Sequence, residues 1–163
     1  LHAAHEGAMT QTQRTWLRYG GNALMLVWLA LGVSVVLFYN TAMGVVYILI
    51  IALSFVTIAY SMCSKCPCRL ESCAHIWLGR LTELLPGREP GEYTSWDGLG
   101  SVLYLVGLHA LPQFWLWRHK ALFALFWALS LGVFLMLYFA ACPSCKNQYC
   151  PLKLRFGDHD VQN

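Results

Sequence analysis

The sequence predicts an all-α integral membrane protein with four transmembrane helices in two hairpins, a short amphipathic interfacial helix and a cytoplasmic cysteine-rich metal site. Three observations lead to this prediction. Of the 163 residues, 58% are hydrophobic and only 12% are charged, whereas a soluble domain carries about 25% charged residues. Four long apolar runs contain no Asp, Glu, Lys or Arg. Seven cysteines form two groups, and each group directly follows an apolar run.

Each apolar run is long enough to cross a hydrocarbon core of about 30 Å as a helix. The predicted spans are residues 23–39, 43–62, 99–117 and 121–141. Short turns join the first span to the second and the third to the fourth, so we expect two hairpins. The expected segments are an N-terminal segment 1–21, a hairpin 22–62, a loop 63–98, a hairpin 99–141 and a tail 142–163. Within the spans, Gly44, Gly107 and Gly132 are expected to let helices approach closely.

The positive charges are distributed unevenly between the two ends of the predicted bundle. Nine of the 11 Lys and Arg residues lie in the N-terminal segment, the loop or the tail, and only Arg118 and Lys120 lie at the other end. The positive-inside rule then places both termini and both cysteine groups in the cytoplasm, with the chain in the plasma (inner) membrane. The net charge of +3 follows from this asymmetry. We expect the lipid bilayer as a partner and no nucleic acid.

The loop between the hairpins contains a predicted short helix. Ser72 is a favourable N-cap, and Pro86 and Gly87 end the helical pattern near Leu85. One face of this helix is apolar and carries Trp77, Leu78, Leu81, Leu84 and Leu85. Such a helix is expected to lie on the membrane surface. The remainder of the loop, residues 88–97, is polar and is either a docking surface for a partner or a solvated loop.

The seven cysteines are the strongest functional signal. The first group has the pattern C-x2-C-x-C-x4-C and the second has the pattern C-x2-C-x4-C-P. The predicted ligands are Cys63, Cys66, Cys68, Cys73, Cys142, Cys145 and Cys150. Because spans two and four run in the same direction, the two groups are expected at the same face of the membrane. The first group has the overall length of a bacterial ferredoxin run, C-x2-C-x2-C-x3-C-P.

Several arguments favour metal ligation over disulfides. Cytoplasmic thiols are kept reduced, and an odd number of cysteines cannot pair completely within one chain. Closely spaced thiolates need a cation to neutralise them, and Lys65, Arg69 and Lys146 would add positive charge nearby. Two cubane clusters would need eight ligands, and His75, an Asp, water or a partner protein would supply the eighth. One cluster with spare cysteines and two zinc sites also fit this ligand set.

The two cysteine segments resemble the cytoplasmic cysteine–proline cluster motifs of membrane-bound quinol-oxidising ferredoxin proteins. Cys66, Cys142 and Cys150 are each followed by proline. The resemblance covers the cysteine segments alone. It implies one or two iron–sulfur clusters, of the 4Fe–4S type, and exchange of electrons with a quinone.

His109 is the only histidine inside a predicted span. An ionisable residue at this depth is a functional candidate, here as a contact for a quinone headgroup. The alternative is a histidine that is hydrogen-bonded to a neighbouring helix. Pro112 follows on the same span and is expected to free backbone carbonyls near it.

The sequence thus favours a membrane iron–sulfur protein that passes electrons between a cytoplasmic redox partner and a quinone or a partner membrane subunit. It would then serve as a redox subunit of an oxidoreductase complex, and other subunits are expected as partners. Three alternatives stay open. Zinc would join loop and tail in a structural or docking protein; a thiol–disulfide oxidoreductase would use Cys142 and Cys145; and a heavy-metal-handling protein would use the same thiols. Phosphate-binding and dinucleotide-binding motifs are absent from the sequence.

Overall fold

The computed structural model describes residues 11–66, 76–89 and 91–141 of the chain. Within these ranges the secondary structure is entirely helical. The α-helices are α1 (Gln11–Tyr39), α2 (Thr41–Ile58), α3 (Ile76–Leu81), α4 (Ser95–Leu116) and α5 (Lys120–Leu135). The first of three short elements, η1 (Ala59–Cys63), is a π-helix that continues α2, and η3 (Met136–Ala141) is a π-helix that continues α5. A 3-10 turn, η2 (Thr82–Leu84), continues α3.

Four of these helices are long and apolar enough to cross a membrane, which confirms the predicted spans and indicates a membrane protein. Their candidate spans are Thr15–Tyr39, Thr41–Cys63, Ser95–Leu116 and Lys120–Tyr138. Large apolar side chains are exposed on all four helices, for example Leu26, Leu49, Leu103 and Leu131. A soluble monomer rarely exposes so much contiguous apolar surface, whereas lipid tails would cover it without cost.

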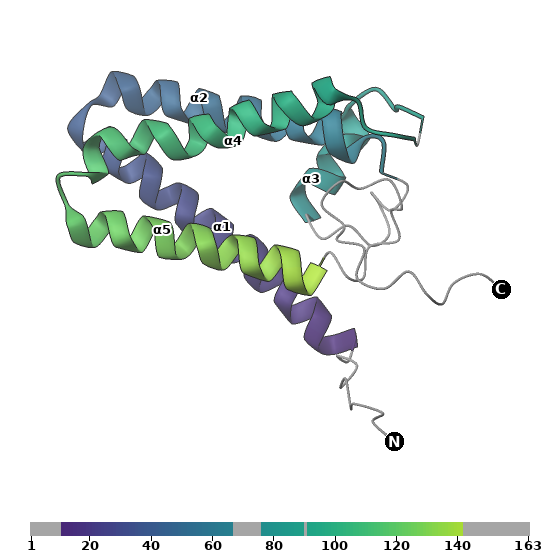
Figure 1. Cartoon of the computed structure of the whole chain (residues 1–163), viewed down its shortest axis with the longest axis horizontal. Helices are drawn as coiled ribbons and strands as arrows, with labels where there is room; N and C mark the ends of the chain where they lie inside the picture. Colours follow the sequence, from purple (N-terminus) through teal and green to yellow (C-terminus); the bar gives the residue numbers. More distant parts are fainter. Residues whose placement is uncertain (1–10, 67–75, 90, 142–163) are drawn as a thin grey trace.

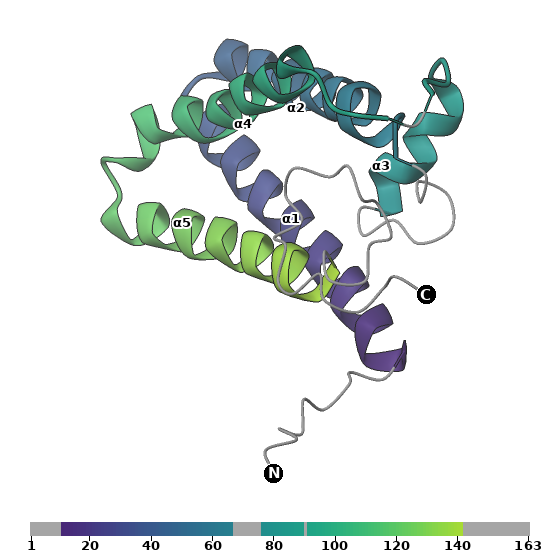
Figure 2. The ribbon, with the colours of Figure 1, turned by 45° about the vertical axis from the view of Figure 1, so that its right-hand side comes forward.

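Helix α1 provides most of the contacts between the two helical hairpins. Helix α1 contacts α2, α4 and α5, while α2 and α4 lie side by side. The two short connections lie at one end of the bundle (Figure 1). Helix α3, the start of α1 and the end of η3 lie at the other end, as Figure 2 also shows. The chain segments that carry most of the polar residues therefore leave the bundle at one end, as the sequence predicts.

The core lies where α1 meets the other long helices. It consists of Trp28, Leu29, Val35, Val36, Tyr47, Leu108, Leu116, Phe126 and Val133. Helix–helix packing in membranes depends on such close contacts, because lipid tails are as apolar as these side chains.

The turn between α1 and α2 is a single residue, Asn40. Its side-chain Oδ1 accepts a hydrogen bond from the backbone N–H of Met43 at 3.0 Å, so Asn40 caps α2. Glycine at position 44 permits this tight turn, because a Cβ there would lie 2.9 Å from the Cα of Leu37. The expectation of a close approach at Gly44 is therefore confirmed, whereas a Cβ at Gly107 would make an ordinary contact of 3.8 Å with Ile50.

Pro112 lies inside α4 and has no N–H to donate to the carbonyl of Leu108, four residues earlier. The hydroxyl of Tyr47, on α2, donates to that carbonyl at 2.8 Å. Tyr47 is completely buried, and Gly32 on α1 leaves room for it, because a Cβ at Gly32 would lie 2.9 Å from the Tyr47 oxygen. The proline thus frees one carbonyl, as predicted, and a neighbouring helix satisfies it.

We predict that Gly44→Ala lowers the free energy of unfolding by about 1–3 kcal/mol, because the new methyl group would force α1 and α2 apart. Gly107→Ala is the matched control, since it adds the same methyl group to a helix where space exists; we expect it to be neutral or stabilising by about 0.5–1 kcal/mol. Unfolding in mixed micelles would measure both. Equal effects of the two substitutions would contradict the close approach at Gly44.

A double-mutant cycle tests the Tyr47–Leu108 hydrogen bond. We predict that Tyr47→Phe destabilises the wild-type protein by about 1–2 kcal/mol, because it leaves the Leu108 carbonyl unsatisfied. In a Pro112→Ala background, the restored N–H can bond to that carbonyl, so Tyr47→Phe should cost less. Equal costs in both backgrounds would show that Pro112 is not the reason for the bond.

Candidate metal centre

Two of the predicted metal ligands lie in the described part of the chain. Cys63 is the last residue of η1, and Cys66 follows three residues later. The other predicted ligands lie outside the described residues, and they are Cys68, Cys73, His75, Cys142, Cys145 and Cys150. Within residues 11–66, 76–89 and 91–141, no group of three or more His, Cys, Asp or Glu side chains could hold a metal ion. The complete metal site therefore stays a prediction.

The two helices that precede the cysteine groups end in the same unusual way. Helix α2 ends in the π-helix η1, and α5 ends in the π-helix η3, which stops at the residue before Cys142. In η1 the wide turn is closed by the N–H of Ser64, which donates to the carbonyl of Ala59 at 2.8 Å. The hydroxyl of Ser61 also donates to the carbonyl of Thr57, at 2.7 Å. Wide turns of this kind occur frequently at functional sites.

Cys63 lies in a small apolar cluster at the end of α2. Its exposed fraction is 8%, and it packs with Ala59 of η1 and Leu78 of α3. Leu81 and Leu85 pack against the same cluster. The short helix therefore covers Cys63 from the side of the loop and limits its access to water.

The apolar side chains predicted on one face of residues 72–85 do not all point to the same surroundings in the structure. Leu78 packs inward against η1, whereas Trp77 and Leu84 are exposed by 55% and 82%. These two side chains are available to a membrane surface, so the interfacial position of the helix stays a prediction. The described part of this helix, α3, starts at Ile76, and the predicted cap Ser72 lies outside the described residues.

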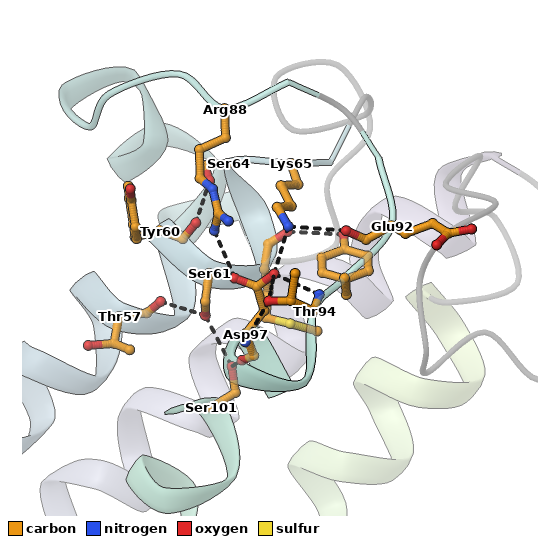
Figure 3. Close-up of polar contacts among 12 residues, drawn as sticks. Thr57, Tyr60, Ser61, Ser64, Lys65, Arg88, Glu92, Thr94, Asp97 and Ser101 are labelled. Atoms are coloured by element: carbon orange, nitrogen blue, oxygen red, sulfur yellow. Dashed lines mark hydrogen bonds and ion pairs between the residues drawn. The ribbon is translucent and has the colours of Figure 1, made fainter. Parts of the chain in front are cut away.

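A buried ion-pair cluster holds the cysteine-bearing segment against α4 (Figure 3). Lys65 Nζ lies 2.7 Å from Oδ2 of Asp97, and Arg88 Nη1 lies 2.8 Å from its Oδ1. Lys65 and Asp97 are 8% and 6% exposed. Because a buried carboxylate needs partners for both oxygens, the cluster fixes three separate stretches of chain together. We call Lys65, Arg88 and Asp97 the charge clamp.

Neighbouring groups complete the charge clamp. Thr94 is the N-cap of α4 and forms a capping box with Asp97: the Thr94 backbone N–H donates to Asp97 Oδ2 at 2.9 Å, and the Asp97 backbone N–H donates to the Thr94 hydroxyl oxygen at 3.4 Å. The Thr94 hydroxyl also donates to Asp97 Oδ2 at 2.9 Å. Lys65 Nζ also donates to the backbone carbonyl of Glu92 at 3.1 Å. The guanidinium of Arg88 lies over the ring of Tyr60, 5.1 Å from its centroid.

Further hydrogen bonds connect η1 to the start of α4. The hydroxyl oxygens of Ser61 and Ser101 lie 3.2 Å apart, and the Ser101 hydroxyl oxygen lies 3.0 Å from the carbonyl oxygen of Asp97. The hydroxyl of Tyr93 donates to the carbonyl of Met62 at 3.1 Å. The residues just before Cys63 are thus held at several points, so the direction in which the chain leaves α2 is well determined.

The charge clamp changes the interpretation of two residues. The sequence predicts that Lys65 adds positive charge near the cysteines, whereas its ammonium group is paired with Asp97. Asp97 belongs to α4 and is buried, rather than part of a polar loop that ends at residue 97. The sequence carries a signal for this, because Thr94 and Asp97 form a T-x-x-D capping pattern directly before an apolar run. The pairing of Asp97 with Lys65 and Arg88 has no such local signal.

His109 lies at the contact between α4 and α5. Its Nδ1 is 2.8 Å from the carbonyl of Leu105, and its Nε2 is 2.8 Å from the hydroxyl of Ser130 on α5. Because a carbonyl only accepts, Nδ1 carries a hydrogen and donates it to Leu105, while Nε2 lies within hydrogen-bond distance of the Ser130 hydroxyl. The rings of Trp28 and Trp127 lie 4.9 and 5.5 Å from the imidazole. A histidine bonded to a neighbouring helix is therefore what the structure contains.

No protein-family model, curated protein or solved structure matches the chain. The interpretation of the site consequently depends on the residues of the chain and on their arrangement.

We predict that Asp97→Ala lowers the free energy of unfolding by about 3–5 kcal/mol, because it leaves the buried Lys65 ammonium and the Arg88 guanidinium without their carboxylate. Glu92→Gln is the matched control. Its side chain is exposed and only its backbone carbonyl contacts Lys65, so we expect a change within about 0.5 kcal/mol. Amide hydrogen exchange in lipid nanodiscs should show faster exchange at residues 60–66 in Asp97→Ala alone. Unchanged exchange there would contradict the role of the clamp.

Proposed function

We propose that this protein is a membrane-bound iron–sulfur electron-transfer protein that acts as a redox subunit of a larger oxidoreductase complex. It would pass electrons between a cytoplasmic redox partner and a quinone or a partner membrane subunit. One observation carries the proposal: the first cysteine group begins at the last residue of η1 and the second begins directly after η3, and both π-helices lie at the same end of the bundle. Two distant segments that start at the same end of the bundle would bring seven thiols to one face of the membrane, which suits a shared metal centre.

The ligand set supports iron–sulfur clusters over disulfides. The cysteines are separated by one to four residues within each group, and such density of thiolates requires neutralisation by metal. Four thiolates hold one 4Fe–4S cluster, so seven cysteines complete one cluster and nearly complete a second. His75, a partner protein or solvent would supply the eighth ligand. The apolar cluster around Cys63 supports a site with restricted solvent access, which influences the potential of a cluster.

The orientation in the proposal depends on charge. Nine of the 11 Lys and Arg residues belong to segments at the end of the bundle where the cysteines are found. On this basis both termini and both cysteine groups would face the cytoplasm of a cell with the protein in its plasma (inner) membrane. The exposed Trp96 and Trp117, near opposite ends of α4, support a membrane-spanning position, since tryptophan is enriched at both membrane interfaces.

His109 is the proposed contact for a quinone headgroup. The exposed apolar surface of α4 and α5 around it would give a quinone access from the lipid. Its Nε2 is bonded to Ser130, so a quinone carbonyl would have to replace that hydroxyl and accept a hydrogen bond from an N–H at Nε2. The proposed cluster and its exchange of electrons with another subunit do not depend on this contact.

The decisive experiment is anaerobic purification of the full chain in detergent, followed by visible and EPR spectra and by assays of iron, sulfide and zinc. We expect iron and acid-labile sulfide in equal amounts, and a visible absorption that dithionite bleaches. A colourless protein with stoichiometric zinc would overturn the proposal and favour a structural or docking role. Labelling of Cys150 by an impermeant thiol reagent from outside the cell would instead favour a thiol–disulfide oxidoreductase that uses Cys142 and Cys145.

Substitution of single cysteines tests the ligand set. We predict that Cys66→Ser and Cys145→Ser each lose at least half of the bound iron, because each change removes a thiolate from a cluster. Ser144→Ala is the control, since it changes a residue between two predicted ligands without removing a thiol. Iron content equal to that of the wild type in both cysteine variants would exclude these two residues as ligands.

A further inference from the structure

We propose that a groove between α2 and α4 binds an acyl chain of an anionic phospholipid, whose phosphate is bound by Arg118 and Lys120 at the connection between α4 and α5. The groove and both cations belong to the described part of the chain. This inference goes beyond the proposed electron transfer and depends on none of the cysteines.

The groove has the size and the lining of a site for hydrocarbon. Its volume is about 590 Å³, within the range of about 300–1,000 Å³ that is typical of small-molecule sites. All of its lining residues are apolar, and they are Met43 and Ile50 on α2 and Gly107, Ala110, Leu111, Phe114 and Trp115 on α4. Small residues leave room on α4, since even a Cβ at Gly107 would only reach ordinary contact with Ile50, at 3.8 Å.

The groove is about as long as one membrane leaflet is deep. Met43 lies in the first turn of α2 and Trp115 in the last turn of α4, at the end of the bundle that carries both short connections (Figure 1). From there the lining extends along α2 to Ile50 and back along α4 to Gly107. At 1.5 Å per residue this is about 10–12 Å, and half of a hydrocarbon core of about 30 Å is about 15 Å.

Two cations follow directly after the outer end of the groove. The backbone N–H of Arg118 donates to the carbonyl of Trp115 at 3.2 Å, so Arg118 lies within one turn of the groove lining. Lys120 is the first residue of α5, and both cationic side chains are exposed. Long cationic side chains extend along apolar surface toward the headgroup layer of a membrane.

The charge at this end of the bundle indicates which lipid fits. All eight Asp and Glu residues belong to the N-terminal segment, the loop 63–98 or the tail, so neither short connection contains an acid. Between the two cations, His119 Nε2 is hydrogen-bonded to the hydroxyl of Tyr39, which connects this turn to the end of α1. An apolar groove with two cations at its end is complementary to a molecule with a hydrocarbon chain and an anionic headgroup.

Substitutions of the cations test the headgroup contact. Arg118→Gln and Lys120→Gln each remove one positive charge from the end of the groove. Arg80→Gln is the matched control, because it removes the same charge from an exposed position on α3 at the opposite end of the bundle.

Substitutions in the groove test the acyl-chain contact. Ala110→Phe fills the groove from an exposed position on α4, and Ala128→Phe is its control, because it adds the same side chain at an exposed position on α5. Gly107→Leu is a second groove-filling variant, and it carries the test if Ala110→Phe does not fold.

The measurement is photo-crosslinking of the full chain in phosphatidylcholine nanodiscs that contain a trace of phosphatidylglycerol with a diazirine in its acyl chain. Phosphatidylcholine with the same labelled chain is the parallel probe, and mass spectrometry of peptides locates the crosslinks. We expect labelling of residues 43–50 and 107–115 to favour phosphatidylglycerol, and each of Arg118→Gln and Lys120→Gln to lower this labelling about fivefold. Ala110→Phe should reduce labelling there by both lipids, whereas Arg80→Gln and Ala128→Phe should leave it unchanged.

Three results would overturn the inference. Equal labelling by the two lipids in the wild type would show that the groove has no preference for an anionic headgroup. Full competition by glycerol phosphate, which has the anion but no acyl chain, would show an anion site at the connection that does not need the groove. Crosslinks between two copies of the chain through the groove, without lipid labelling, would assign it to a second copy.

Discussion

Polar groups inside the helical bundle have no water to bond, and the rest of the structure depends on how the protein satisfies them. Pro112 leaves the Leu108 carbonyl without its helical donor, and the hydroxyl of Tyr47 reaches across from α2 to supply one. That single bond explains why a tyrosine is acceptable in the core and why Gly32 must lie opposite it. His109 obeys the same constraint, because both of its ring nitrogens have partners.

At the N-terminal end of α4, the same need for hydrogen-bond partners applies to charged groups. Asp97 is buried at the first turn of the helix, where only several donors make a carboxylate tolerable. The donors come from Lys65, Arg88 and Thr94, so satisfying one side chain also ties η1, the loop and α4 together. The fold near the cysteines is therefore a consequence of charge burial as much as of apolar packing.

The long helices were predictable because length and absence of charge depend only on the local sequence. The capping box of Thr94 and Asp97 is equally local, although the polar composition of residues 88–97 predicts a loop there. The partners of Asp97 could not be predicted, since Lys65 is 32 residues away and no spacing rule connects them. The π-helical ends also escape prediction, because an apolar run has the same hydropathy in either helical form. The grouping of the cysteines was read from the sequence, whereas their joint geometry extends beyond the described residues.

The π-helical turn in η1 rotates the residues after it about the helix axis relative to the preceding span. A wide turn contains about one residue more than an α-helical turn, and one residue corresponds to about 100° of rotation. Residues after the turn therefore lie on a different side of the helix axis from the one that an unbroken helix would give them. Cys63, the last residue of η1, packs inward against Leu78, whereas α2 presents many apolar side chains outward along its length. The same offset occurs at η3, which rotates Met136–Ala141 relative to the path of an unbroken α5.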